Sequence, residues 1–114
     1  HVPMPGGTWL PEWIVALSAT PLVVARAGLG TINHTILTVE ALRALKLAPP
    51  AFFMSCTQSE SAEAVEQNRF APQARLELPS LGVLPFRHAP DAPIEAATWL
   101  EPNWLEILGW GNKA

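Results

Sequence analysis

The sequence predicts an α/β fold in which helices flank a parallel sheet. Apolar runs of strand length recur along the chain, and helical segments of about 12 to 16 residues separate them. This alternation is typical of parallel strands that are joined by right-handed crossovers. The chain has 114 residues, of which 49% are hydrophobic, so it can form the core of one compact domain. We therefore expect a single α/β domain over residues 1–114.

The first expected helix covers residues 8–18, where aromatic and apolar side chains recur at helical spacing. Thr8 is placed to cap this helix, and Pro11 falls in its first turn, where proline is tolerated. Residues 20–27, TPLVVARA, are a continuous apolar run without alternation. Such a run is typical of a strand buried on both faces of a parallel sheet, so we expect a central strand there.

The next three elements continue the alternation. A helix is expected over residues 31–47, with an apolar stripe that includes Leu37 and Ala41. Residues 50–56, PAFFMSC, predict the next buried strand. Residues 59–70, SESAEAVEQNRF, predict the following helix, because its first turn is acidic, as the helix dipole favours. The order is strand, helix, strand, helix.

The end of the chain predicts one more strand and a helical region. Residues 81–86, LGVLPF, read as a third strand that Pro85 ends. Residues 91–110 predict one or two amphipathic helices, broken near Pro102. We therefore expect residues 87–114 to form a C-terminal helical tail.

Composition argues against several classes of protein. The net charge is −3 with only 7 Lys and Arg residues, so we expect no nucleic-acid partner. The apolar runs are shorter than the ~20 residues that a bilayer span needs, so we expect no membrane-spanning helix. Cys56, the one cysteine, has no disulfide partner, and no signal-peptide pattern opens the chain, which favours a cytoplasmic protein. The three histidines, His1, His34 and His88, are too scattered to predict a metal site.

A glycine-rich turn, RAGLGTINHT, follows the first strand at residues 26–35. In open parallel sheets, ligands bind beyond the carboxyl ends of the strands. Gly28 and Gly30 let a ligand approach the backbone, and Thr31 is placed to cap the next helix. The amides from Gly30 to Asn33 would then face outward at the positive end of a helix dipole, which suits a carboxylate or phosphate. The alternative is a tight connection with nothing bound, and the turn matches neither the P-loop nor the dinucleotide pattern.

Other candidate residues have plainer explanations. A lone histidine such as His34, one residue inside a helix, is more often a hydrogen-bonded packing residue than a catalyst. Cys56 ends a strand without a nearby His or Lys to lower its pKa, so we expect a buried, unreactive thiol. Glu60, Glu63 and Glu66 are expected to form a solvated helix face.

Two longer stretches resemble a known family. Residues 23–43, VVARAGLGTINHTILTVEALR, closely resemble the strand, loop and helix of dethiobiotin synthetases, which are ATP-dependent enzymes of biotin synthesis. Residues 81–85, LGVLP, resemble that family's last strand, and residues 1–5, HVPMP, resemble the stretch after its acidic glycine-rich motif. The resemblance extends to about Phe86. It implies a fold of the P-loop NTPase type, of which this chain is the C-terminal half.

The resemblance also implies a reaction. Enzymes of this family use CO2, 7,8-diaminononanoate and MgATP, and they act as homodimers with the substrate across the dimer interface. A carbamate formed on one amine is phosphorylated by ATP, and the second amine then attacks to close the ureido ring. By the same resemblance, the substrate's terminal carboxylate is received by the turn residues Gly28, Gly30, Thr31, Ile32 and Asn33.

The nucleotide site that the resemblance implies lies at the ends of the second and third strands. Its residues are Ser55, Cys56, Leu84, Pro85 and Phe86. Phe86 is able to stack on the adenine base. Ser55 and Cys56 depart from the family pattern, which commonly has Asn-Asp there, and Ser55 still offers a hydroxyl. Nucleotide preference is therefore a point to test.

The family's Walker-type loop, its catalytic lysine and its acidic Mg²⁺ ligands precede HVPMP, and none of them is in this chain. Phosphoryl transfer depends on such positioned cations, so we expect these 114 residues alone to be inactive and to be a C-terminal fragment of the enzyme. Two alternatives stay open. One is a related P-loop amidating synthetase of the cobyrinic acid type, and the other is a non-catalytic domain that keeps the dimer surface.

Overall fold

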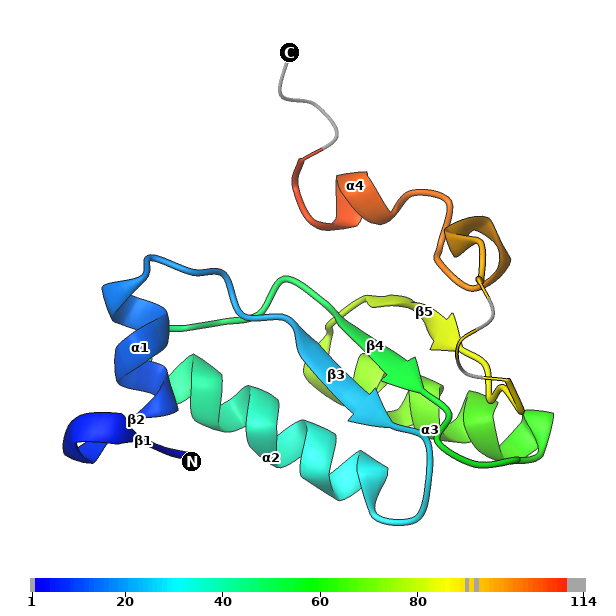
Figure 1. The fold of residues 1–114 in the computed structure, drawn as a ribbon, viewed down its shortest axis with the longest axis horizontal. Coiled ribbons are helices and arrows are strands. Elements are labelled where there is room, and N and C mark those ends of the chain that lie inside the picture. The colour runs from blue at the N-terminus through cyan, green and yellow to red at the C-terminus, as the bar shows by residue number, and fades with distance from the viewer. Residues whose placement is uncertain (1, 90, 92, 111–114) are drawn as a thin grey trace.

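The computed structural model describes residues 2–89, 91 and 93–110. Its main sheet has three parallel strands in the order β3-β4-β5. Helix α2 joins the first strand to the second, α3 joins the second to the third, and the two helices contact each other along one side of the sheet (Figure 1). The elements are β3 (Val23–Arg26), α2 (Thr31–Ala44), β4 (Phe52–Ser55), α3 (Ala62–Leu76) and β5 (Ser80–Leu84). The prediction of an α/β fold with flanking helices is confirmed.

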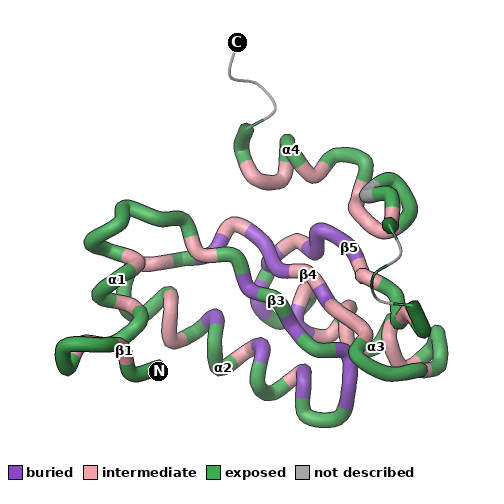
Figure 2. Tube along the Cα trace, in the orientation of Figure 1, coloured by how far each residue is buried: buried purple, intermediate pink, exposed green. Residues whose placement is uncertain are grey.

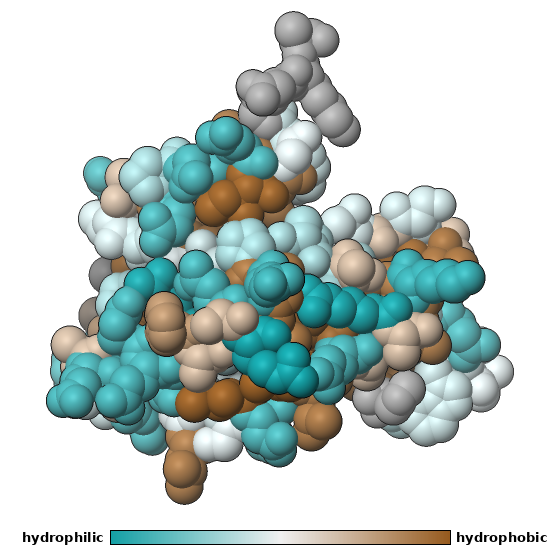
Figure 3. All heavy atoms as spheres, turned by 180° about the vertical axis from the view of Figure 1, so that it is seen from behind, coloured by the Kyte–Doolittle hydropathy of each residue, from teal (hydrophilic) through white to brown (hydrophobic). Residues whose placement is uncertain are grey.

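The core lies between the sheet and these two helices. Phe52 and Met54 of the central strand β4 are fully buried, and so is Val39 of α2. Leu76, the last residue of α3, joins the same cluster. Figure 2 shows buried residues concentrated on the three strands, while the outer surfaces of the chain are exposed. Seen from behind, hydrophilic residues cover much of the molecule, with apolar groups between them (Figure 3).

Strand β3 differs from its prediction. Among the described residues it pairs with β4 alone, so it is an edge strand rather than a central one. Val23 and Ala25 are buried, whereas Val24 is 56% exposed and Arg26 is also exposed. The prediction of a central strand buried on both faces is wrong for this chain, because the chain's own helices α2 and α3 cover only one side.

Helix α2 begins at Thr31, as expected, but Thr31 does not cap it. The N-cap is Gly30, in the left-handed conformation with φ 88°. The Thr31 hydroxyl is buried and lies 3.5 Å from the Thr35 hydroxyl. This hydroxyl pair belongs to the buried face of α2, which therefore differs from the expected stripe, and Leu37 of that stripe is 55% exposed.

The first residues form a small unit of their own that the sequence did not predict. Two short antiparallel strands flank a 3-10 turn and lie beside α1, away from β5 (Figure 1). The elements are β1 (Pro3–Met4), the 3-10 turn (Pro5–Gly7) and β2 (Thr8–Trp9).

Helix α1 (Leu10–Ala16) lies inside the range expected for the first helix. Its N-cap is Trp9, whose amide donates to the Glu12 carboxylate (2.6 Å). The prediction that Thr8 caps this helix is wrong. Thr8 belongs to β2, and its hydroxyl donates to the carbonyl of Pro5 (3.0 Å).

Helix α3 is longer than predicted. It starts after Ser61, whose hydroxyl accepts from the Ala64 amide (3.1 Å), and runs past the expected end at Phe70. Pro72 lies inside the helix and is fully buried. A proline removes one backbone donor, but burial of its ring in the core compensates for this loss.

The C-terminal helices are shorter than predicted. The described residues contain a 3-10 turn at Ala96–Thr98 and the short helix α4 (Trp104–Ile107). Residues 99–101 between them run beside β5. Residues 1, 90, 92 and 111–114 lie outside the described part, so the expected tail over residues 87–114 is described only in part.

Candidate functional site

The candidate residues at the ends of the three strands lie side by side. In the parallel register Arg26 pairs with Ser55, and Ser55 pairs with Leu84. Backbone hydrogen bonds continue one step beyond the strands, from the Ala27 amide to Ser55 (2.9 Å) and from the Cys56 amide to Leu84 (2.9 Å). The topology therefore brings the glycine-rich turn and the expected nucleotide residues to one end of the sheet.

The turn after β3 is tight, and some of its backbone amides and carbonyls bond to each other. The Thr31 amide donates to the Gly28 carbonyl (3.1 Å), and the His34 amide donates to the Gly30 carbonyl (3.0 Å). Gly30 has φ 88°, a conformation that is costly for residues with a side chain. The Thr31 amide therefore has a partner already.

The amides of Ile32 and Asn33 lie between these two bonds. They belong to the first turn of α2, where N–H groups have no acceptor within the helix. Ile32 is half-buried and Asn33 is exposed. The 14 residues of α2 also direct the positive end of a helix dipole toward this turn. Ile32 and Asn33 are therefore candidates to donate their amides to an anion.

Two charged side chains that sequence reasoning missed flank Gly28. A Cβ atom placed on Gly28 would lie 3.9 Å from Arg26 Nε and 3.9 Å from Glu60 Oε1. The Gln58 side chain donates to the same Glu60 oxygen (2.7 Å). Glu60 precedes α3, so it lies apart from the helix face on which it was expected. The signal that it was near the turn was its place after β4, the strand next to β3.

The other side of the turn is occupied by an imidazole ring. A Cβ atom placed on Gly30 would lie 3.6 Å from Cε1 of His34. His34 was expected to be a hydrogen-bonded packing residue, and the structure places it exposed on the first turn of α2. The turn is therefore flanked by Arg26 and Glu60 near Gly28, which have opposite charges, and by the His34 ring near Gly30.

Cys56 is half-buried at the end of β4. Burial raises the pKa of its thiol, the nearby Glu60 carboxylate raises it further, and a backbone hydrogen bond with Phe86 works in the opposite direction. A raised thiol pKa is the direction expected for an unreactive cysteine, whereas Cys56 is half-buried and not fully buried as expected. Its contribution at this site is packing and hydrogen bonding.

The segment after β5 has an accessible aromatic ring. Leu84 is half-buried, whereas Pro85 and Phe86 are exposed. The Phe86 ring meets the His88 ring edge to face, with their centroids 4.9 Å apart. This contact holds Phe86 beside the strand ends and leaves it partly open to a ligand.

A cavity of about 780 Å³ lies along β3 and α2 and extends to α1. At the turn its lining is polar and includes Arg26, Thr31 and His34. Elsewhere apolar side chains such as Val24 and Leu45 line it. The cavity therefore combines a polar end beside the turn with a longer apolar wall.

Among residues 2–89, 91 and 93–110, no three His, Cys, Asp or Glu side chains lie together in a way that could hold a metal ion. None of the helices described here has both the length and the apolar character needed to cross a bilayer.

Comparison with known proteins identifies relatives. The family model described as "AAA domain" matches residues 3–93. An ATP-dependent dethiobiotin synthetase of Anaeromyxobacter sp. (strain Fw109-5) is 63% identical over 41 residues, which are 36% of this chain and 18% of the relative. That of Mycobacterium sp. (strain JLS) is 37% identical over 96 residues, which are 81% of this chain and 41% of the relative.

A third relative has the same name. The ATP-dependent dethiobiotin synthetase of Thermodesulfovibrio yellowstonii is 37% identical over 68 residues, 57% of this chain and 28% of the relative. The aligned part of the chain thus spans less than half the length of these curated relatives. The resemblance that the sequence predicted is confirmed. The chain belongs to the AAA domain family, and the relatives described here are ATP-dependent dethiobiotin synthetases.

Proposed function

We propose that the complete protein is an ATP-dependent dethiobiotin synthetase, which closes the ureido ring of dethiobiotin from 7,8-diaminononanoate, CO2 and ATP. The observation that carries this proposal is the strand, glycine-rich turn and helix over residues 23–44. Through this segment the chain resembles the family, and its geometry suits the carboxylate of the substrate. The 114 residues alone are expected to be inactive.

In this proposal the turn binds the substrate carboxylate. The amides of Ile32 and Asn33 donate to it, and Gly28 and Gly30 allow it to come close to the backbone. Arg26 adds a positive charge beside the turn. The cavity along α2 supports this assignment, because its polar end and apolar wall match a ligand with a carboxylate and an aliphatic chain.

The nucleotide is assigned to the ends of β4 and β5. Phe86 and Pro85 are exposed there, next to Leu84, and they offer an apolar surface to a base. Ser55 and Cys56 lie beside them in the register of the sheet. This chain's part of the work is to bind and orient the nucleotide base, whereas the cations that phosphoryl transfer needs belong to the rest of the protein.

Two further properties belong to the same proposal. Relatives of this kind are expected to act as homodimers with the substrate across the interface, so a second copy would complete the carboxylate site. We assign the protein to the cytoplasm, which supplies ATP. Size-exclusion chromatography with light scattering on the complete polypeptide tests the dimer.

The reaction itself is the main test. The complete polypeptide of the reading frame is incubated with 7,8-diaminononanoate, bicarbonate and MgATP, and dethiobiotin and ADP are measured by mass spectrometry. We expect both products in equal amounts. Glutamine-dependent amidation of a corrinoid carboxylate would instead indicate the cobyrinic acid type, and a reading frame that starts at this chain and has no turnover would indicate a non-catalytic domain.

The turn is tested by replacing Gly30 with valine. The φ of 88° and the nearby His34 ring both oppose a side chain there. We expect the Kd for 7,8-diaminononanoate to rise about tenfold or more, as for loss of a charge-assisted hydrogen bond, and the Kd for ATP to change far less. Gly7→Val is the matched control, because Gly7 has φ 75° with no atom within 4 Å. Equal losses for both ligands would contradict the carboxylate assignment.

A further inference from the structure

Residues 99–101, named here the edge segment, lie antiparallel beside β5. The Val83 amide donates to the Trp99 carbonyl (3.2 Å), and the Glu101 amide donates to the Leu81 carbonyl (2.7 Å). These bonds use backbone groups on the side of β5 that faces away from β4. The outer edge of β5 is therefore occupied by the chain itself.

Strand β5 contains a bulge at the point where the edge segment docks. Ser80 pairs with Phe52 and Val83 pairs with Met54, so β5 advances by one residue more than β4 between these pairs. The buried Ser80 hydroxyl accepts from the Gly82 amide (3.2 Å), which supplies a partner inside the bulge. A bulge of this kind bends a strand and redirects the residues that follow it.

The bulge and the edge segment meet at Gly82. Gly82 has φ 140°, which residues with a side chain rarely adopt, and it pairs with Leu100. A Cβ atom placed on Gly82 would lie 2.0 Å from the Trp99 carbonyl oxygen. Only glycine at this position allows the bulge and the edge segment to coexist.

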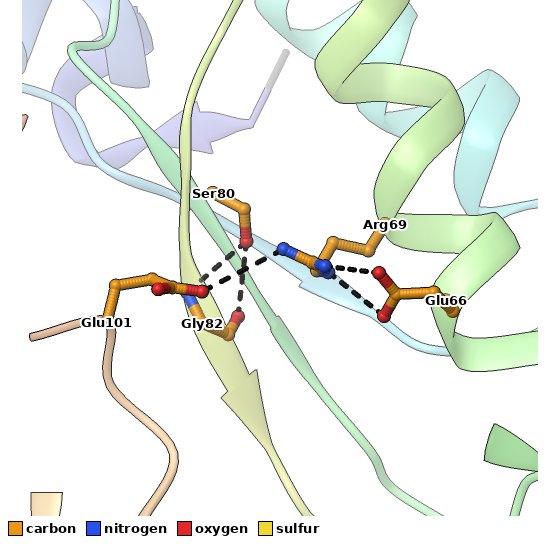
Figure 4. Close-up of polar contacts among 5 residues, drawn as sticks. All are labelled: Glu66, Arg69, Ser80, Gly82 and Glu101. Carbon is orange, nitrogen blue, oxygen red and sulfur yellow. Dashed lines mark hydrogen bonds and ion pairs between the residues drawn. The ribbon is translucent and has the colours of Figure 1, made fainter. Parts of the chain in front are cut away.

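Two side chains connect the edge segment to the rest of the fold. The Trp99 ring lies 5.6 Å, centroid to centroid, from the Phe53 ring of β4. The Glu101 carboxylate lies 3.9 Å from Arg69 Nη1 of α3, and Arg69 also pairs with Glu66 (Figure 4). The segment is thus attached to β4, β5 and α3 together.

We propose that Gly82 and the edge segment position the nucleotide site. They fix β5 on its outer side, as β4 does on its inner side, and so determine where Leu84, Pro85 and Phe86 leave the sheet. The last edge bond is on Val83, immediately before Leu84. Gly82 is therefore a positioning residue for nucleotide binding, and this inference rests on the proposed function.

The first test uses Gly82→Ala in the complete polypeptide. The added methyl group displaces the edge segment, so we expect the Kd for MgATP, measured by calorimetry, to rise about tenfold, an effect of the order of one hydrogen bond. The Kd for 7,8-diaminononanoate should stay within about twofold, because the turn that is proposed to bind it follows β3, and β4 separates β3 from β5. Gly109→Ala is the control, since Gly109 has φ 76° with no atom within 4 Å.

A second variant leaves the sequence of β5 intact. Glu101→Pro removes the amide that donates to Leu81, and Glu101→Gln removes only the charge. The difference between these two variants in the Kd for MgATP reports on the backbone of the edge segment, that is, on the lost hydrogen bond together with the conformational restriction by proline, and not on the charge of Glu101. We expect Glu101→Pro to weaken MgATP binding about fivefold more than Glu101→Gln.

Hydrogen exchange gives a readout that does not require nucleotide. The Cys56 amide donates to Leu84 and reports on the end of β5, so its exchange should accelerate in Gly82→Ala and Glu101→Pro. In Gly82→Ala, faster exchange at Val83 and Glu101 with an unchanged Kd for MgATP would overturn the inference, and so would equal weakening of both ligands. If the wild type binds no ATP, the proposed function fails, while Cys56 exchange still decides whether the edge segment fixes the end of β5.

Discussion

The two edge strands of the sheet differ in whether another segment pairs with them. At β5 the chain supplies its own cover, with hydrogen bonds to Leu81 and Val83 from the edge segment. At β3 the described residues supply no second neighbour, and Val24 is exposed beside the cavity along α2. An unpaired parallel strand with apolar side chains is a template for another strand. The comparison shows that, among the described residues, one edge of the sheet is covered by the edge segment and the other has no neighbouring strand.

The largest effect on stability is expected in the central strand β4, which lies between the two edge strands. Phe52→Ala in β4 removes a fully buried ring from the core, and we expect a loss of about 3–5 kcal/mol in the free energy of unfolding. Phe53→Ala is the matched variant on the other face, where Trp99 is a ring neighbour, and its ring contact is worth about 1 kcal/mol. Urea denaturation of the complete polypeptide measures both. Equal losses would mean that the two faces of β4 are equally packed.

The open edge is tested by two neighbouring valines. Val23→Thr places a hydroxyl in the core, and we expect a cost of about 1–3 kcal/mol. Val24→Thr changes an exposed side chain, and its effect should stay within about 0.5 kcal/mol. Thermal denaturation compares them. If Val24→Thr were as costly as Val23→Thr in the complete polypeptide, another part of the protein would be covering that face of β3.

The smallest effect on the free energy of unfolding is expected from the ion pair between Arg69 and Glu66, which lies near the edge segment. The hydrogen bond from Arg69 lowers the pKa of Glu66 below its ordinary value. This pair therefore adds stability above the ordinary carboxyl pKa, and the contribution is lost as the pH falls through the lowered pKa. Because Glu66 is largely exposed, Glu66→Gln should cost well under about 1 kcal/mol at neutral pH and nothing at acid pH. Melting curves across this pH range measure the difference, and a constant cost would show that the ion pair is not its source.

Sequence patterns predicted those boundaries of helices and strands that are set by residues next to them in the sequence. The start of α2 at Thr31 follows from the glycine-rich turn, and the end of β5 at Leu84 follows from Pro85. The prediction that β3 is buried on both faces was wrong for a different reason. A continuous apolar run shows that a strand can be buried on both faces, but whether it is depends on elements that this chain does not supply.

The candidate site was predictable in part. The turn glycines were visible in the sequence, whereas the approach of Glu60 to Gly28 depends on the order of the strands. Gly82 was overlooked although a glycine inside a strand pattern is a known sign of a bulge. Its bridge partner Leu100 was expected in a helix, because apolar spacing cannot distinguish a helix from a short extended segment.

The order of the strands in the sheet has a consequence for synthesis. Strands β3, β4 and β5 are neighbours in space in the order in which they leave the ribosome, so each can dock on the one made before it. The residues that cover β5 follow it in the sequence, so they are translated after it. During that interval the outer edge of β5 is exposed on the nascent chain, and an exposed strand edge can pair with another chain.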